Sequence, residues 1–283
     1  MARKQAPSLR AQWLGQQLRE LRDQRGLTLH DAAEYLQRNT GTVSRFETAE
    51  YPIRRPDLMA LLDLYRVSSR RIRDEFIQLS QEIWQRGWWD GYADAVEHSF
   101  VDYLWLEQRA IEIRSYDALM LPGLLQTEEY AEAMIRAHSP EAKEEKIRRW
   151  IELRMTRQQV LCGDSAPRVL VTVEEGALRR RVGGTDTMRG QREHLLVCAK
   201  RPTIEIRVLT SATGAHPGTA GGFKIFTLVE PFPEIGYGET SMGAIYVEPP
   251  KTDVLRERYE RLRVVALSPS ESLDFISAIP KGR

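Results

Sequence analysis

The sequence predicts a two-domain protein, in which an all-α domain with a helix-turn-helix motif precedes an α+β domain. The chain of 283 residues is longer than a single domain usually is, so two cores are expected. Apolar residues recur at helical spacing up to residue 161, whereas short β-branched segments follow Pro167. We therefore expect domains of 1–83 and 84–283, the second with a helical first half and a mostly antiparallel sheet.

The first predicted helix covers residues 9–25, where Leu14, Leu18 and Leu21 form one apolar stripe. Gly26 is expected to end it, because glycine readily adopts the left-handed conformation that follows many helices. Charged residues of both signs share the remaining surface of this helix. That mixture predicts a solvated face for most of the arginines, with one or two of them in contact with DNA; they are Arg10, Arg19, Arg22 and Arg25.

Two short helices are predicted within residues 27–50. Thr28 is a suitable N-cap for the first of them, and Asp31 stands three residues later as the partner of a capping box. The helical pattern ends near Leu36. Only a few polar residues separate it from the next helix, which is the spacing of a helix-turn-helix.

The second helix of this pair is predicted to follow Asn39, its N-cap, and to turn Val43 and Phe46 inward. Its outward side chains are short hydrogen-bonding groups and one arginine, which suit base edges in a major groove. The expected base contacts are Thr40, Thr42, Ser44 and Arg45. The expected phosphate contacts are Arg38, Asn39, Arg54 and Arg55. A short helix pair by itself equally fits a plain αα-hairpin, so the assignment depends on its context.

The residue order here resembles the Cro and phage-repressor class of helix-turn-helix proteins, the XRE family, over residues 9–73. The resemblance rests on G-L-T at 26–28, A-A-E-x-L at 32–36, T-V-S-R-F-E at 42–47 and Glu50. Three residues depart from it. Gln37 stands where the turn usually has glycine, Ala49 replaces the glycine after the second helix of the pair, and Leu29 replaces a polar residue that commonly meets phosphate. The resemblance implies a homodimer that binds two operator half-sites about 34 Å apart on double-stranded DNA.

The distribution of charge agrees with a nucleic-acid partner for the first domain. The net charge of the whole chain is only +1. Residues 1–80, however, hold 14 Lys and Arg against 10 Asp and Glu, while the rest of the chain is slightly acidic. The positive charge is therefore concentrated where the helix-turn-helix pattern lies.

The second domain is predicted to begin with helices and to continue with short strands. A helix over 68–84 is expected to close the first domain or to bridge to the second. In the second domain, helices are expected over most of 96–161 and over 188–200, 252–267 and 269–277. Strands are expected at 168–173, 203–209, 222–229, 235–239 and 244–247, the last two as a hairpin. Trp88 and Trp89 are expected to pack into the second core.

Four segments of this domain resemble the C-terminal domain of a large actinobacterial group of regulators described as Scr-type and antitoxin-like. They are L-E-x-x-A-x-x-I-R at 106–114, L-P-G-L-L-Q-T-x-x-Y-A at 121–131, R-x-x-R-Q-x-x-L at 154–161 and E-x-x-L-R-R-x-V-G at 175–183. The resemblance implies a small protein partner encoded by a neighbouring gene. It also implies an alternative function, in which the chain neutralises that partner and DNA binding serves autoregulation.

The sequence offers no enzyme motif. It has no G-x-S-x-G, no H-E-x-x-H and no P-loop, so neither catalysis nor a cofactor is expected. Cys162 and Cys198 have neither the spacing nor the neighbours of a metal site or a disulfide, and both are expected to be small buried residues. There is no membrane segment or signal peptide, so the expected location is cytoplasmic and nucleoid-associated.

An effector or partner pocket is expected in the second domain. Its candidate residues are Arg154, Arg157, Gln158 and His216. The first three either line a pocket for an acidic partner or hold their helix against the sheet. His216 lies in a glycine-rich loop, residues 214–222, where it acts as a general base, a ligand contact or a surface turn residue; the turn is favoured.

Overall fold

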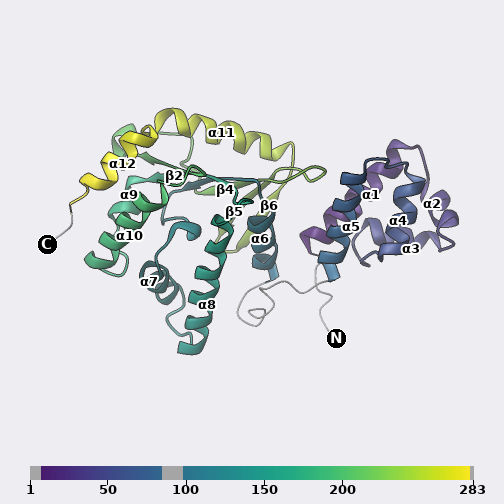
Figure 1. Cartoon of the computed structure of the whole chain (residues 1–283), viewed down its shortest axis with the longest axis horizontal. Helices are drawn as coiled ribbons and strands as arrows, with labels where there is room; N and C mark the ends of the chain where they lie inside the picture. Colours follow the sequence, from purple (N-terminus) through teal and green to yellow (C-terminus); the bar gives the residue numbers. More distant parts are fainter. Residues whose placement is uncertain (1–7, 85–97, 281–283) are drawn as a thin grey trace. The chain divides into compact units, whose positions relative to one another are not determined.

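The computed structural model of the chain describes residues 8–84 and 98–280 (Figure 1). These residues form two compact units, one built from the N-terminal helices and one built around a sheet. Trp88 and Trp89 lie outside the described residues, and the domain boundary between 83 and 84 stays a prediction. No helix in the described ranges has both the length and the apolarity needed to cross a bilayer.

The first unit is all-α, as predicted. Its helices are α1 (Leu9–Gln24), α2 (Leu29–Tyr35), α3 (Thr40–Glu47), α4 (Arg55–Leu64) and α5 (Arg70–Trp84). The core of this unit includes Trp13, Leu14, Leu18, Ala32, Ala33, Val43, Phe46, Leu58, Leu61, Leu62, Phe76 and Leu79. The prediction of a helix-turn-helix within an α-helical domain is therefore confirmed for α2 and α3.

Local hydrogen bonds explain where α2 and α3 begin. Thr28 accepts from the backbone N–H of Asp31 at 3.2 Å, and the carboxylate of Asp31 accepts from the N–H of Thr28 at 2.7 Å. Asn39 Oδ1 accepts from the N–H of Thr42 at 2.8 Å. Both predicted caps are thus confirmed, and they satisfy N–H groups that a helix start otherwise leaves without a partner.

The two turns that flank α3 require a left-handed backbone. Gln37 has φ 55° and Ala49 has φ 58°, and these are the positions at which the resemblance called for glycine. A side chain at positive φ meets steric repulsion that glycine avoids. The chain keeps the turn geometry with less favourable residues.

The second unit contains a six-stranded mixed sheet in the order β3-β2-β1-β4-β5-β6. The strands are β1 (Glu112–Asp117), β2 (Arg168–Glu174), β3 (Ile204–Leu209), β4 (Phe223–Thr227), β5 (Ile235–Thr240) and β6 (Gly243–Val247). The pairs β1·β2 and β2·β3 are parallel, and the pairs β1·β4, β4·β5 and β5·β6 are antiparallel. The α+β fold and the final hairpin are confirmed.

The strand β1 corrects the prediction of one long helix over this part of the chain. The charged side chains of β1 made this segment look like a surface helix in the sequence. In the structure these side chains are paired with residues of neighbouring segments. Arg114 lies 2.7 Å from Glu112 and 3.1 Å from Glu234, and Arg168 lies 3.2 Å from Glu112. Tertiary partners thus make a central strand from a sequence whose polar residues suggest a surface helix.

Helices cover both faces of this sheet. They are α6 (His98–Arg109), α7 (Glu128–His138), α8 (Glu144–Arg157), α9 (Glu175–Arg179), α10 (Thr185–Cys198), α11 (Lys251–Val265) and α12 (Pro269–Ala278), with short 3₁₀ turns η2 (Gly123–Leu125), η3 (Gln158–Leu161) and η4 (Ser211–Thr213). Figure 1 shows α11 on one side of the sheet and α6, α7 and α8 on the other. Tyr259 and Leu262 of α11 pack in a core cluster with Tyr116 and Phe223, whereas Tyr103 of α6 contacts Phe226 and Tyr237.

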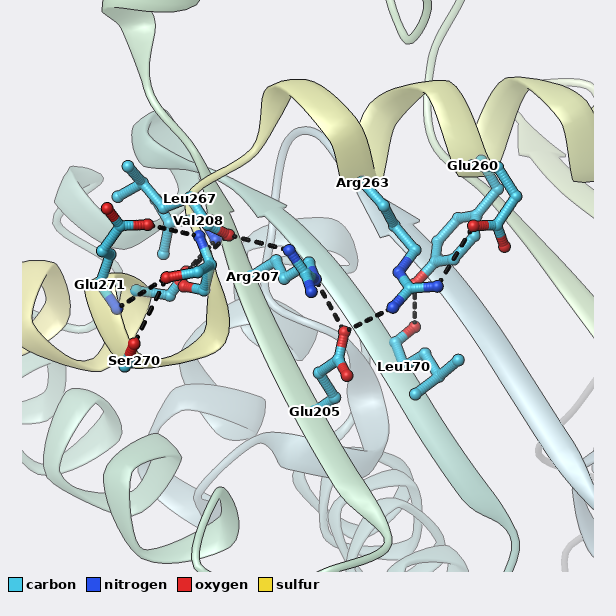
Figure 2. Close-up of polar contacts among 12 residues, drawn as sticks. Leu170, Glu205, Arg207, Val208, Glu260, Arg263, Leu267, Ser270 and Glu271 are labelled. Atoms are coloured by element: carbon cyan, nitrogen blue, oxygen red, sulfur yellow. Dashed lines mark hydrogen bonds and ion pairs between the residues drawn. The ribbon is translucent and has the colours of Figure 1, made fainter.

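The C-terminal helices are joined to strand β3, as Figure 2 shows. The Oε1 atom of Glu205 accepts from Arg207 at 2.7 Å and from Arg263 of α11 at 3.1 Å. The N–H of Val208 donates to Ser272 Oγ of α12 at 2.9 Å. Part of the backbone at this sheet edge is therefore bonded within the chain, which limits pairing with another strand.

The two cysteines differ in exposure. Cys198 is buried as expected, but Cys162 is exposed, which corrects the prediction for that residue. Both are free thiols.

Candidate functional site

The helix α3 presents a polar face away from the core of the first unit. Val43 is fully buried and Phe46 is 7% exposed. On the other side, Thr40 and Arg45 are exposed, and Thr42 and Ser44 are half-buried. The four residues expected to contact bases are therefore brought onto a single exposed helix, with Arg45 as the longest side chain.

The predicted phosphate residues flank this helix on both sides. Arg54 is the N-cap of α4 and Arg55 is its first residue, and both are exposed. The first N–H groups of a helix are electropositive, so this position favours an anion. Arg38 is also exposed, but its guanidinium lies 3.4 Å from Asp57 of α4. Because Asn39 Oδ1 caps α3, a phosphate contact from Asn39 would use its amide nitrogen.

An ion pair between Arg22 and Glu47 fixes α3 against α1. Arg22 Nε lies 2.7 Å from Glu47 Oε1, and Nη2 lies 2.9 Å from Oε2, with both side chains below 10% exposed. The same guanidinium donates from Nη1 to the carbonyl of Leu27 at 2.8 Å, before α2. One side chain of α1 therefore links both helices of the helix-turn-helix.

Two of the arginines expected on the solvated face of α1 are buried instead. Arg22 is 7% exposed, and Arg10 is 8% exposed and donates to the carbonyl of Glu82 at 2.9 Å. Arg25 donates to the carbonyl of Tyr65 at 2.7 Å. The sequence did contain a signal for Arg22, because it lies one turn after Leu18 on the apolar stripe.

The backbones of α1 and α3 also approach each other closely, in addition to the ion pair between Arg22 and Glu47. A Cβ atom at Gly15 of α1 would lie 2.5 Å from the carbonyl oxygen of Glu47 and 2.7 Å from that of Phe46. Only glycine allows α1 to pass so near the end of α3. The position of the polar face of α3 is therefore set by packing as well as by charge.

In the second unit, the structure places three of the four predicted pocket residues together. Arg157 makes a two-bond ion pair with Glu107 of α6, with both hydrogen bonds at 2.8 Å and both side chains 4% exposed. Its guanidinium also lies 5.1 Å from the ring centres of Phe100 and Tyr103. These contacts hold α8 against helix α6, whereas the predicted structural role was to hold α8 against the sheet.

Arg154 and Gln158 bond to the turn between β1 and α7. Arg154 Nη1 donates to Gln126 Oε1 at 2.9 Å, and Gln158 Nε2 donates to the carbonyl of Gln126 at 2.7 Å. Gln191 of α10 contacts the same turn, donating to the carbonyl of Leu125 at 2.7 Å. The segments that carry the resemblance at 106–114, 121–131 and 154–161 thus meet in one polar network.

His216 has contacts of its own. Its Nε2 lies 3.2 Å from Glu174 Oε1, and its Nδ1 accepts from the N–H of Gly218 at 3.2 Å. Since Nδ1 is an acceptor, the neutral ring carries its proton on Nε2 and donates it to Glu174. Tyr116 donates to the same oxygen at 2.6 Å. These bonds hold the loop of His216, whose side chain is 13% exposed and so lies deeper than the favoured interpretation as a surface turn residue implies.

A serine and a lysine with catalytic potential also lie together, at the paired positions of β1 and β4. Lys224 Nζ donates to Ser115 Oγ at 2.6 Å and lies 3.2 Å from Asp117 Oδ1. Lys224 donates to both partners, and Ser115 Oγ donates to Asp117 Oδ2. Ser115 is only 1% exposed. The three groups therefore satisfy one another.

Comparison with known families assigns both parts of the chain. The family described as helix-turn-helix domain matches residues 13–76. The family described as domain of unknown function (DUF5753) matches residues 100–278, more than half of the chain. The chain belongs to the DUF5753 family. The helix-turn-helix match supports a DNA-binding regulator. Searches among curated proteins and among solved structures found no match for this DUF5753 protein.

Proposed function

We propose that this DUF5753 protein is a sequence-specific transcription regulator of the Cro and phage-repressor type, whose C-terminal domain senses a small protein or a ligand. The observation that carries the proposal is the exposed polar face of α3, with Arg45 outward and Val43 and Phe46 in the core. A helix that is held against the core and exposes a polar face can enter the major groove of duplex DNA and contact base edges.

In this proposal the residues of the interface divide into two groups. Thr40, Thr42, Ser44 and Arg45 contact base edges, and Arg38, Asn39, Arg54 and Arg55 contact phosphates. The chain acts as a homodimer on an operator with two half-sites, since one α3 spans only part of a helical turn of DNA. Phosphate contacts release counterions, so affinity falls steeply as the salt concentration rises.

Footprinting of the purified full chain across the genes that flank its own gene tests this function. The expected result is protection of two half-sites about 34 Å apart, which is one turn of B-DNA. Protection without any sequence preference contradicts the proposal, and so does the absence of any protection at low salt.

The alternative function is neutralisation of a small partner protein, with DNA binding as autoregulation. It is favoured by the exposed apolar side chains next to the 121–131 turn: Leu119 is 67% exposed and Met120 is 43% exposed. Exposed apolar residues of this size commonly belong to protein contacts. Pull-down from the native host with the full chain, and with Leu119→Ser and Met120→Ser together, tests it. The same small protein should be captured by the first and lost by the second.

A further inference from the structure

Arg154 is held in one place by uncharged groups. It lies on α8, three residues before Arg157, and its Nη1 donates to Gln126 Oε1 at 2.9 Å. A Cβ atom at Gly123 would lie 2.9 Å from the same nitrogen, so the guanidinium rests directly against the turn. The side chain is half-buried. It is thus positioned in advance but remains reachable from solvent.

Two other arginines show how this chain binds a carboxylate. Arg22 holds Glu47 through Nε and Nη2 at 2.7 and 2.9 Å. Arg157 holds Glu107 through the same two nitrogens, each at 2.8 Å. This edge of the guanidinium matches the spacing of the two carboxylate oxygens.

Arg154 does not use that edge within the described part of the chain. Its bond to Gln126 involves Nη1, while Nε and Nη2 donate to none of the residues at 8–84 and 98–280. No carboxylate of those residues lies within 4.0 Å of it. The two donors with the geometry for a carboxylate are therefore available.

The charge of Arg154 is poorly compensated. Its neighbour Arg157 is neutralised by Glu107, whereas Arg154 has only the amide oxygen of Gln126. Burial, followed by the charge of Arg157, lowers the pKa of Arg154 to about 10, although Tyr103, Glu107 and Glu239 oppose that shift. An anion bound here would relieve the cost of a partly desolvated cation.

A second cation acts on the same region. Burial raises the pKa of Tyr130, which lies under the turn, while the hydrogen bond from the N–H of Leu121 and, after it, the charges of Arg180 and Arg154 counteract that rise. Asp117 also acts on Tyr130, but it is paired with Lys224 at 3.2 Å. Two arginines, Arg154 and Arg180, thus act on Tyr130 beside the turn.

We propose that Arg154 binds a carboxylate of the effector or partner through Nε and Nη2, in the two-bond geometry of the other two pairs. The inference rests on the proposed sensing function of the C-terminal domain and names the chemistry of its ligand. The carboxylate comes either from a small molecule or from a peptide chain.

The test is a ¹H–¹⁵N spectrum of the arginine Nε groups of the full chain, titrated with sodium acetate against sodium chloride at constant ionic strength. The Arg154 signal, identified by its loss in Arg154→Lys, is expected to shift and saturate. Arg148→Lys, on the exposed surface of the same helix, should keep the saturating shift. A shift of the Arg154 signal that never saturates, or that equals the effect of chloride, overturns the proposal.

Further titrations distinguish a small-molecule carboxylate from a carboxylate of a peptide chain. A capped tripeptide with an internal glutamate and a tripeptide with a free C-terminus each replace acetate. Binding of either at least tenfold tighter than that of acetate indicates a protein ligand, and equal binding indicates a small molecule. Inorganic phosphate that saturates at lower concentration than acetate overturns the carboxylate assignment.

This test is independent of DNA binding. The footprint of Arg154→Lys on operator DNA should equal that of the wild type, since Arg154 lies outside the helix-turn-helix. If the wild-type chain gives no footprint but its Arg154 signal still shows the acetate shift, the regulator proposal falls and the anion site stands. If the wild-type chain gives the footprint but no acetate shift, the anion site falls and the regulator proposal stands.

Discussion

Arg22 and Glu47 join the first helix of the N-terminal unit to the last turn of α3 through hydrogen bonds of 2.7 and 2.9 Å. The bond to Glu47, which outweighs the effect of burial, raises the pKa of Arg22. Both side chains of this pair are below 10% exposed. Arg22 has a second partner in Asp23, at 2.6 Å from Nη1, but the side chain of Asp23 is 55% exposed, so Glu47 is the buried counter-charge. The orientation of the proposed DNA-reading face therefore depends on a contact that never meets DNA.

Glu47→Gln is expected to lower the free energy of unfolding by about 3 kcal/mol, because it removes the buried counter-charge of Arg22 and leaves only Asp23, whose side chain is 55% exposed. Denaturant titration followed by circular dichroism measures it. Glu50→Gln, at an exposed position, is the matched control and should have little effect. The double variant Arg22→Met, Glu47→Leu should recover most of the loss. Equal stabilities of Glu47→Gln and Glu50→Gln would show that the pair is not needed.

Gln37→Gly is expected to stabilise the first unit by about 1 kcal/mol, since Gln37 holds φ 55° in the turn between α2 and α3. The exposed side chain contributes little that glycine would lose. Glu34→Gly, within α2, is the control and should cost about 1 kcal/mol. Thermal unfolding distinguishes the two signs. Destabilisation by both substitutions would contradict the strained conformation of Gln37.

The capping box of α2 predicts a pH dependence. Hydrogen bonds from the backbone and the side chain of Thr28 lower the pKa of Asp31. A carboxyl whose pKa is lower in the folded state stabilises the fold above its unfolded pKa of about 4, and this is lost as the pH falls through the folded value. Asp31→Asn should therefore unfold with a weaker dependence on pH below about pH 4 than the wild type. If the stabilities of the wild type and Asp31→Asn depend equally on pH below about pH 4, the claim is refuted.

Arg154 and Arg157 should respond differently to the same substitution. Arg157→Met is expected to lower the free energy of unfolding by about 3–5 kcal/mol, because Glu107 would be left buried and unpaired. Arg154→Met should cost far less, since no carboxylate loses its partner. Denaturant titrations of both variants test the difference. If Arg154→Met proves the more damaging, Arg154 is a structural residue and not a ligand contact.

The sequence predicted elements whose determinants are local. Thr28, Asp31 and Asn39 mark helix starts by their own hydrogen bonds, and Val43 and Phe46 follow the helical period. Long-range partners were not accessible in the same way. Strand β1 was missed because Arg114 depends on Glu234, 120 residues away, and Arg22 was placed in solvent because Glu47 belongs to another helix. In the C-terminal domain, the sequence grouped Arg154, Arg157 and Gln158, but only the structure separated the paired arginine from the one with free donors.

The measurement that tests the account most directly compares the affinity of wild type and Arg45→Ala for the footprinted operator and for random DNA at one salt concentration. A specific contact of Arg45 with a base is worth about 1–3 kcal/mol, so the ratio of the two affinities should fall by roughly 5- to 150-fold. Arg19→Ala, at an exposed position on α1, should keep the wild-type ratio. An unchanged ratio in Arg45→Ala would contradict the claim that α3 reads the DNA sequence.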